Sequence, residues 1–133
     1  LLAGIPRGLP GLLRAYRIQE RAAKVGFDWP KGDPSPVIAK VEEELNELKD
    51  NITNGAVREA TEEELGDLLF AVANLSRHLK ADPETTLHKA CVKFSDWYRI
   101  VEAEVAVSGR EWSDFTLDEL EGFWQKAKRQ EEE

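Results

Sequence analysis

Several residue types are scarce or missing in this chain of 133 residues. It contains no methionine, and we therefore expect either a trimmed protein or a piece of a longer one. Its one cysteine, Cys91, cannot form a disulfide within the chain, and its position in an apolar helical stripe predicts a buried thiol in a reducing compartment. No apolar run approaches the length of a membrane-spanning helix, and the first residues lack the charged and apolar regions of a signal peptide. We therefore expect a cytoplasmic protein without a membrane partner.

Positive charge is also in short supply. The chain has 18 lysines and arginines against 26 acidic residues, which gives a net charge of −8 at pH 7. This balance disfavours binding to nucleic acid or to anionic membranes, because both are polyanions. Neither of the common phosphate-binding loops, Gly-x-x-x-x-Gly-Lys or Gly-x-Gly-x-x-Gly, occurs in the sequence. A small anionic ligand would therefore need a metal bridge or a local basic patch.

Histidine is represented only by His78 and His88. A di-iron carboxylate bundle uses Glu-x-x-His on two helices, whereas the residues three positions before these histidines are Leu75 and Thr85. Catalysis of the Ser-His-Asp or Cys-His type finds no recognisable local context. We therefore expect both histidines to be ordinary surface or packing residues.

What the sequence does contain is apolar residues at helical spacing, and no stretch alternates apolar and polar residues as a strand would. Start and stop signals flank these stretches: Ser35-Pro36, Asp82-Pro83 and Thr116-x-x-Glu119 at helix starts, and Gly26 and Gly109 after helix ends. The pattern predicts an all-α helical bundle of about five helices in a single domain, residues 1–133. The helices are expected near residues 12–25, 35–50, 61–79, 83–108 and 117–127.

Two of the expected helices carry acidic residues at matched positions. The apolar stripes that predict their packed faces are Ile38, Val41, Leu45, Leu48 and Ile52 in one and Leu65, Leu68, Leu69, Val72, Leu75 and Leu79 in the other. Glu44 and Glu64 lie roughly 70° from their stripe centres. Glu47 and Asp67 lie roughly 130° away in the same rotational direction. If the helices pack antiparallel, four carboxylates face one groove, and they repel one another unless a cation such as Mg²⁺ or Mn²⁺ compensates them.

Other interpretations of these residues are open. Acidic helical faces are often only solvated, and Thr61-x-x-Glu64 also fits a capping box, which would give Glu64 a purely local role. Phe27 and Trp29 lie in a loop rich in proline and glycine. They either plug the end of the core or form an aromatic platform for a ring-shaped ligand.

The acidic motif, taken with its neighbours, resembles that of a known family. Glu43-Glu44-x-x-Glu47, a spacer of sixteen residues and Glu64-x-x-Asp67 are similar to the signature of MazG, in the all-α nucleoside triphosphate pyrophosphohydrolase superfamily. The similarity is most marked to the C-terminal half of the two-domain form. It extends to the segments Arg21–Pro30, Gly66–Ala71, Asn74–Leu79 and Lys126–Glu131.

The resemblance implies Mg²⁺-dependent hydrolysis of NTPs and dNTPs between the α and β phosphates, giving a nucleoside monophosphate and pyrophosphate, with Mn²⁺ as a possible substitute. It also implies a role in nucleotide-pool housekeeping and a homodimer in which helices of both subunits build each active site. Four acidic residues of this chain resemble the family's metal ligands by their position: Glu44, Glu47, Glu64 and Asp67. Glu43 resembles a possible base for the attacking water. Lys93 and Lys128 resemble phosphate contacts, Trp124 a nucleoside contact, and Trp29 of the aromatic loop is a further candidate substrate contact.

Two positions depart from the MazG pattern. Trp97 stands where we would expect arginine in some MazG proteins, and Ala60 lacks the basic side chain expected just before the run Glu62-Glu63-Glu64. Either change would weaken phosphate contacts and so reduce activity or shift substrate preference. They leave room for a second function, a non-catalytic helical dimerisation or regulatory module, which would release no pyrophosphate.

Overall fold

The computed structural model describes residues 1–132, and over these residues it contains helices and no strand. The all-α prediction is therefore confirmed. The elements in chain order are α1 (Gly11–Lys24), α2 (Ser35–Thr53), α3 (Arg58–His78), α4 (Pro83–Ser108), the short 3₁₀ helix η1 (Trp112–Asp114) and α5 (Leu117–Glu132). No helix in this described range is long and apolar enough to cross a membrane.

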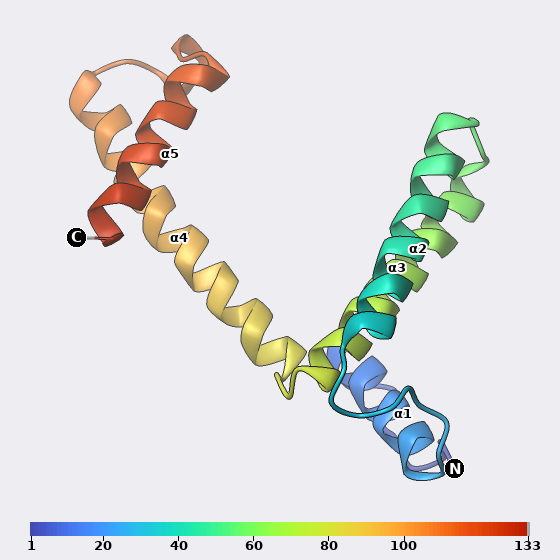
Figure 1. Cartoon of the computed structure of the whole chain (residues 1–133). Helices are drawn as coiled ribbons and strands as arrows, with labels where there is room; N and C mark the ends of the chain where they lie inside the picture. Colours follow the sequence, from blue (N-terminus) through green and yellow to red (C-terminus); the bar gives the residue numbers. More distant parts are fainter. Residues whose placement is uncertain (133) are drawn as a thin grey trace. The chain divides into compact units, whose positions relative to one another are not determined.

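The chain forms two compact units. The N-terminal unit is Leu1–Thr86 and the C-terminal unit begins at Leu87, within α4. In the N-terminal unit α2 and α3 lie side by side as a helical hairpin, and α1 packs against α3 (Figure 1). Val37, Ala71 and Ala73 are buried in this unit. The prediction of a single domain over residues 1–133 is not tested by this division and stays a prediction.

In the C-terminal unit, the later part of α4 packs against α5. Val101 and Val105 of α4 and Ala127 of α5 are buried. An aromatic cluster continues this contact, with the Trp124 ring 4.9 Å from the Phe94 ring and 5.2 Å from the Trp97 ring, measured between centroids. Aromatic pairs at such distances add to the stability that apolar burial provides.

Two of the predicted helix starts are confirmed by their hydrogen bonds. The Asp82 carboxylate accepts from the backbone N–H groups of Glu84 and Thr85, at 2.9 and 3.1 Å. Thr116 and Glu119 exchange side-chain to backbone hydrogen bonds of 3.1 and 3.2 Å, as a capping box requires. The prediction for Ser35 was wrong, because Ser35 is already the first helical residue and makes no side-chain cap.

The capping role considered for Glu64 is also overturned. Helix α3 starts at Arg58, one turn earlier than expected, so Thr61 lies inside the helix. Its hydroxyl donates to the Val57 carbonyl oxygen at 3.4 Å, a bond that threonines inside helices commonly make. The pattern of threonine followed three residues later by glutamate cannot distinguish a cap from a helix interior. Glu64 is thus left without a local structural role at a helix end.

Several residues predicted to be buried are exposed in this chain. The stripe residues Ile38, Leu45, Ile52, Leu65, Leu69, Val72 and Leu79 are 40% to 64% exposed. Cys91, predicted to be a buried thiol, is likewise exposed. The prediction failed because helical periodicity shows which face is apolar and does not show which partner covers it.

Candidate metal and nucleotide site

Three of the predicted metal ligands converge in the hairpin. Glu44 and Glu47 of α2 and Glu64 of α3 each offer one carboxylate oxygen, and these oxygens all lie within 4.8 Å of one another. Glu44 is buried, Glu64 is partly buried and Glu47 is exposed. The cluster is therefore open to solvent on one side. An acidic group of this kind could bind a metal ion.

The electrostatics of the cluster leave negative charge uncompensated. Burial, and next the adjacent Glu47 carboxylate, raise the pKa of Glu64 from 4.5 to about 7. The Oε2 atoms of Glu44 and Glu64 are buried and have no hydrogen-bond partner among the described residues. Lys40 supplies one positive charge, with Nζ 3.1 Å from Glu44 Oε1, and this hydrogen bond raises the pKa of Lys40.

These observations fit a hard cation. The two unpartnered oxygens are buried acceptors, which are costly to leave unsatisfied. All three carboxylates of the cluster present oxygen atoms, the ligand type preferred by Mg²⁺ and Mn²⁺. A divalent ion would satisfy both acceptors and would offset the burial and the repulsion from Glu47 that raise the pKa of Glu64.

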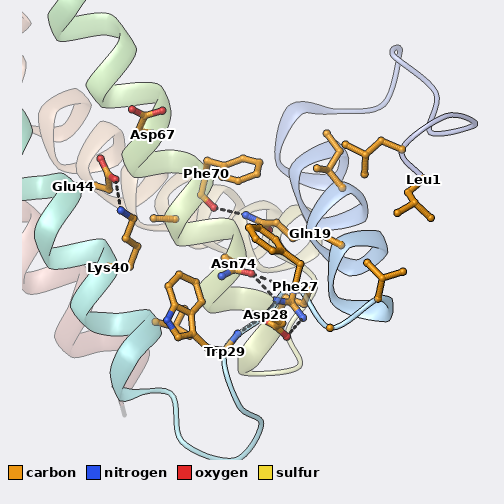
Figure 2. A pocket seen from close by; sticks show the side chains of 18 residues that line it. Leu1, Gln19, Phe27, Asp28, Trp29, Lys40, Glu44, Asp67, Phe70 and Asn74 are labelled. Atoms are coloured by element: carbon orange, nitrogen blue, oxygen red, sulfur yellow. Dashed lines mark hydrogen bonds and ion pairs between the residues drawn. The ribbon is translucent and has the colours of Figure 1, made fainter.

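The other two acidic candidates lie outside this group of three. Asp67 lies on α3 one turn beyond Glu64, is exposed, and lines the same cavity as Glu44 (Figure 2). Glu43 is more than half exposed, and its carboxylate lies 3.4 Å from Lys40 Nζ. The roles assigned to them, metal ligand and base, stay predictions.

A cavity of about 860 Å³ adjoins the acidic cluster within the N-terminal unit. Its wall comes from α1, the loop after α1, α2 and α3, and it includes Glu44 and Asp67 together with the aromatic side chains Phe27, Trp29 and Phe70 (Figure 2). Phe27 is 82% exposed and Trp29 is 36% exposed. The plug interpretation of these two aromatics is therefore wrong, since they line an open cavity.

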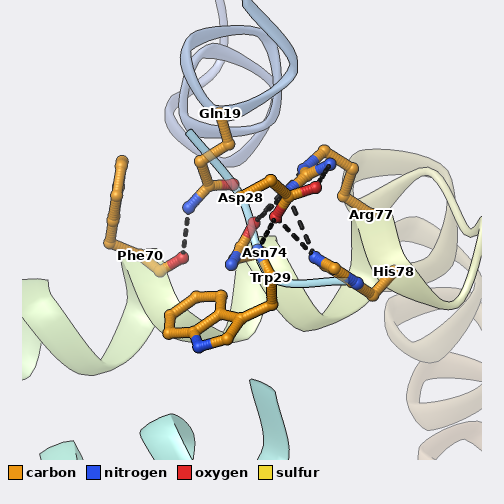
Figure 3. A network of polar contacts seen from close by, with 7 residues as sticks. All are labelled: Gln19, Asp28, Trp29, Phe70, Asn74, Arg77 and His78. Carbon is orange, nitrogen blue, oxygen red and sulfur yellow. Dashed lines mark hydrogen bonds and ion pairs between the residues drawn. The ribbon is translucent and has the colours of Figure 1, made fainter. Parts of the chain in front are cut away.

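A polar network beside the cavity was not foreseen from the sequence. The Asp28 carboxylate accepts two hydrogen bonds from Arg77, at 2.6 and 3.0 Å, and lies 2.9 Å from His78 Nε2 (Figure 3). Asn74 Oδ1 accepts from the same guanidinium group at 2.8 and 3.2 Å. The hydrogen bonds from Arg77 hold the pKa of Asp28 at about 2.

The two histidines differ in their surroundings. His88 is exposed, as expected of a surface residue, whereas His78 belongs to the Asp28 network and its side chain is only 6% exposed. The sequence offered only a weak signal for the contact between Asp28 and Arg77. Asp28 stands in a loop, and 48 residues separate it from Arg77 in the chain, so no local spacing links the two.

The remaining substrate-binding candidates gather in the C-terminal unit. Lys93 Nζ lies 5.3 Å and Lys128 Nζ 5.6 Å from the centroid of the Trp97 ring. The Trp97 ring meets Trp124 edge to face at 5.2 Å between centroids. The three candidates therefore surround Trp97, the residue that departs from the expected arginine. Both lysines are close enough to the ring for cation–π attraction.

Comparison with known proteins adds independent findings. The family model described as the MazG nucleotide pyrophosphohydrolase domain matches residues 33–99. The chain is 47% identical over 131 residues to the nucleoside triphosphate pyrophosphohydrolase of Escherichia coli (strain K12), covering 98% of this chain and 49% of that protein. It is 43% identical over 120 residues to the nucleoside triphosphate pyrophosphohydrolase/pyrophosphatase MazG of Thermotoga maritima, covering 90% of this chain and 45% of that protein.

A more distant similarity links the chain to the uncharacterized protein YabN of Bacillus subtilis, 35% identical over 68 residues. That match covers 51% of this chain and 14% of YabN. The chain spans about half the length of the two pyrophosphohydrolases that it matches.

Proposed function

This chain belongs to the MazG nucleotide pyrophosphohydrolase family, and on that premise we propose that it hydrolyses nucleoside triphosphates between the α and β phosphates. The products are a nucleoside monophosphate and pyrophosphate, and the role is nucleotide-pool housekeeping. The observation that carries this proposal is the convergence of the Glu44, Glu47 and Glu64 carboxylates within 4.8 Å beside an open cavity. NTP and dNTP substrates are both included, with low base specificity.

The cofactor we propose is Mg²⁺, with Mn²⁺ as a substitute, held by Glu44, Glu47, Glu64 and Asp67. Support comes from the all-oxygen ligand set and from the two buried carboxylate oxygens without a partner. When bound, the ion supplies charge neutralisation for the triphosphate and favours ionisation of the attacking water. This is how a chain with a net charge of −8 would hold a polyanion.

The protein residues then position the substrate. Trp29 lies on the cavity wall and would pack against the nucleoside. Lys93 and Lys128 would contact phosphate oxygens and Trp124 would add a nucleoside contact, as the similarity to MazG implies. Glu43 is exposed and would accept the proton of the attacking water.

The protein is proposed to act as a homodimer in the cytoplasm. The exposed apolar stripes of α2 and α3, with Leu45 and Leu69 at 43% and 49% exposure, are surfaces that a second copy would cover. The cytoplasmic location is supported by the presence of a single, exposed cysteine.

The reaction is tested by product analysis. A panel of NTPs and dNTPs is incubated with Mg²⁺, with Mn²⁺ and with a chelator, and pyrophosphate is quantified separately from inorganic phosphate. The expected result is pyrophosphate with monophosphate in a ratio of one to one, and no turnover with the chelator. A folded, metal-loaded protein that releases no pyrophosphate would instead support the dimerisation or regulatory module.

The metal ligands are tested in the same assay. Glu47→Ala and Asp67→Ala should each lower turnover more than about 100-fold while leaving helicity intact, because each removes a charge from the site that orients the phosphates. The matched control is Glu63→Ala, since Glu63 is an exposed acid next to Glu64 on α3. Turnover retained in either ligand variant would contradict the assignment.

A further inference from the structure

We propose that Asp28 is a positioning residue, which fixes Trp29 at the cavity wall by tying the loop between α1 and α2 to the end of α3. This inference rests on the proposed function for its kinetic consequence. Its structural basis is a single carboxylate that bonds both to α3 and to the backbone of Trp29 (Figure 3).

The Asp28 carboxylate bonds both to α3 and to the loop that follows it. Asp28 Oδ1 accepts from Arg77 Nη2 at 2.6 Å and lies 2.9 Å from His78 Nε2. The same oxygen accepts the backbone N–H of Trp29 at 2.9 Å. Since one atom holds all three groups, the Trp29 backbone is linked to α3 through a single side chain.

The side chains of this ion-pair network are largely buried. The side chains of Asp28, Arg77 and His78 are 10%, 13% and 6% exposed, respectively. Ion pairs screened from water in this way are stronger and more directional than pairs at the surface. Asn74 strengthens the arrangement, because its side-chain oxygen accepts from Arg77 and orients the guanidinium group.

The Asp28 side chain is less exposed than the side chains of its neighbours in the loop. Phe27 is 82% exposed and Trp29 is 36% exposed, so neither aromatic is held by deep packing of its own. Gly26 has a φ of 89°, a conformation that glycine adopts freely. The Asp28 side chain joins this loop to α3.

Helix α3 carries both the partners of Asp28 and two residues of the proposed metal site. The helix that carries Arg77 and His78 at its end also carries Glu64 and Asp67 in its first half. Asp67, Asn74 and Arg77 line the cavity together with Trp29. Fixing the loop to this helix therefore sets the distance between Trp29 and the acidic cluster. A nucleotide that spans the two would bind to a surface that is already arranged, which lowers the entropic cost of binding.

The test uses Asp28→Asn, which keeps the size of the side chain and removes its charge. The matched control is Asp33→Asn, because Asp33 lies in the same loop but bonds only locally, to the backbone N–H of Ser35 at 3.0 Å. Both variants are labelled with 5-fluorotryptophan, and the ¹⁹F resonance of Trp29 is assigned from its loss in Trp29→Phe. Asp28→Asn should shift the Trp29 resonance and leave those of Trp97, Trp112 and Trp124 in place, and Asp33→Asn should shift none.

Kinetics provide the second measurement. Asp28→Asn should raise KM for the preferred nucleotide about 10-fold with kcat changed less than about twofold, because the lost hydrogen bonds to a charged group serve binding and not the chemical step. The double variant of Asp28→Asn with Trp29→Ala should have the KM of Trp29→Ala alone, since Asp28 acts through Trp29. Additive effects, or a fall in kcat alone, would overturn the proposal.

A second variant, His78→Ala, tests the same network in case Asp28→Asn does not fold. His78→Ala removes one partner of Asp28 and, since His78 is not among the cavity-lining residues, leaves the cavity wall unchanged. A smaller shift in the same direction is expected. An unmoved Trp29 resonance in both variants overturns the positioning role whether or not the protein turns over nucleotides. If the wild-type protein shows no turnover and the two variants still shift the Trp29 resonance, the result contradicts the proposed function and supports the anchoring of the loop by Asp28.

Discussion

Two carboxyl groups in the N-terminal unit show how surroundings decide the charge of a residue. The pKa of Asp28 is held at about 2 by the hydrogen bonds from Arg77, while the pKa of Glu64 is raised to about 7 by burial and by Glu47. Both groups start from ordinary values near 4. A cationic partner stabilises the ionised form, whereas desolvation and a like charge destabilise it. The first group is therefore held as an anion, and the second is poised to exchange a proton for a cation.

The low pKa of Asp28 predicts an acid-sensitive contribution to stability. Because the pKa in the folded state is below that in the unfolded state, the unfolded chain binds more protons as the pH falls from about 4 to about 2. Stability from this group is therefore complete above pH 4 and is lost towards pH 2, and it amounts to about 2 kcal/mol. The measurement is the free energy of urea unfolding of wild type and Asp28→Asn from pH 6 to pH 2. The difference between the two proteins should shrink across this window, and a constant difference would contradict the prediction.

At the scale of secondary structure, the acidic cluster joins two helices. Glu44 and Glu47 belong to α2 and Glu64 to α3, so a bound cation would bridge the hairpin. The sequence predicted this convergence on the condition that the two helices pack antiparallel, because equal rotational offsets from the apolar stripes then place the acids on one side of the pair. It was not sufficient to place Asp67 relative to the other three acids, since that depends on the offset of the helices along their axes.

This bridge predicts a stabilising effect of Mg²⁺ or Mn²⁺ that depends on pH. The ion competes with the proton on Glu64, whose raised pKa near 7 leaves the group largely protonated at pH 6 and ionised at pH 8. The thermal midpoint should therefore rise more with metal at pH 8 than at pH 6. At a metal concentration of 100 times Kd the added stability is about 2.7 kcal/mol. Differential scanning fluorimetry provides the measurement.

The control for the metal effect is a variant that removes the charge at the bridge. Glu64→Gln should lose the metal-dependent rise at both pH values, while Glu63→Gln, an exposed neighbour on the same helix, should keep it. Equal stabilisation of both variants would place the ion elsewhere.

At the scale of the whole molecule, the most informative feature is apolar surface that the N-terminal unit does not cover itself. Stripe residues on α2 and α3 that helical periodicity assigns to a packed face are 40% to 64% exposed. Exposed apolar residues that recur along two packed helices are typical of an interface. Helical periodicity identified an apolar face on each helix, and the structure shows that the other segments of the N-terminal unit leave these residues exposed.

We therefore expect Leu69→Lys to convert a dimer into a monomer. A charge in the middle of a covered apolar stripe would be buried without a partner, which is strongly unfavourable. Light scattering after size-exclusion chromatography should give twice the 15.0 kDa chain mass for wild type and the single mass for the variant. Val107→Lys is the control, because Val107 is 87% exposed and lies in the C-terminal unit. A wild-type protein that elutes as a monomer would refute the homodimer.

The sequence by itself determined the helices, most of their ends, the matched acidic pairs and the similarity to MazG. Each of these depends on neighbours within a few turns, where spacing fixes geometry. Only the tertiary structure decided that Phe27 and Trp29 line a cavity and that Asp28 meets Arg77 and His78. Those contacts join residues far apart in the chain, and they form only when a loop of irregular conformation closes against a helix. No periodic pattern encodes that closure, because it follows from the packing of the whole unit.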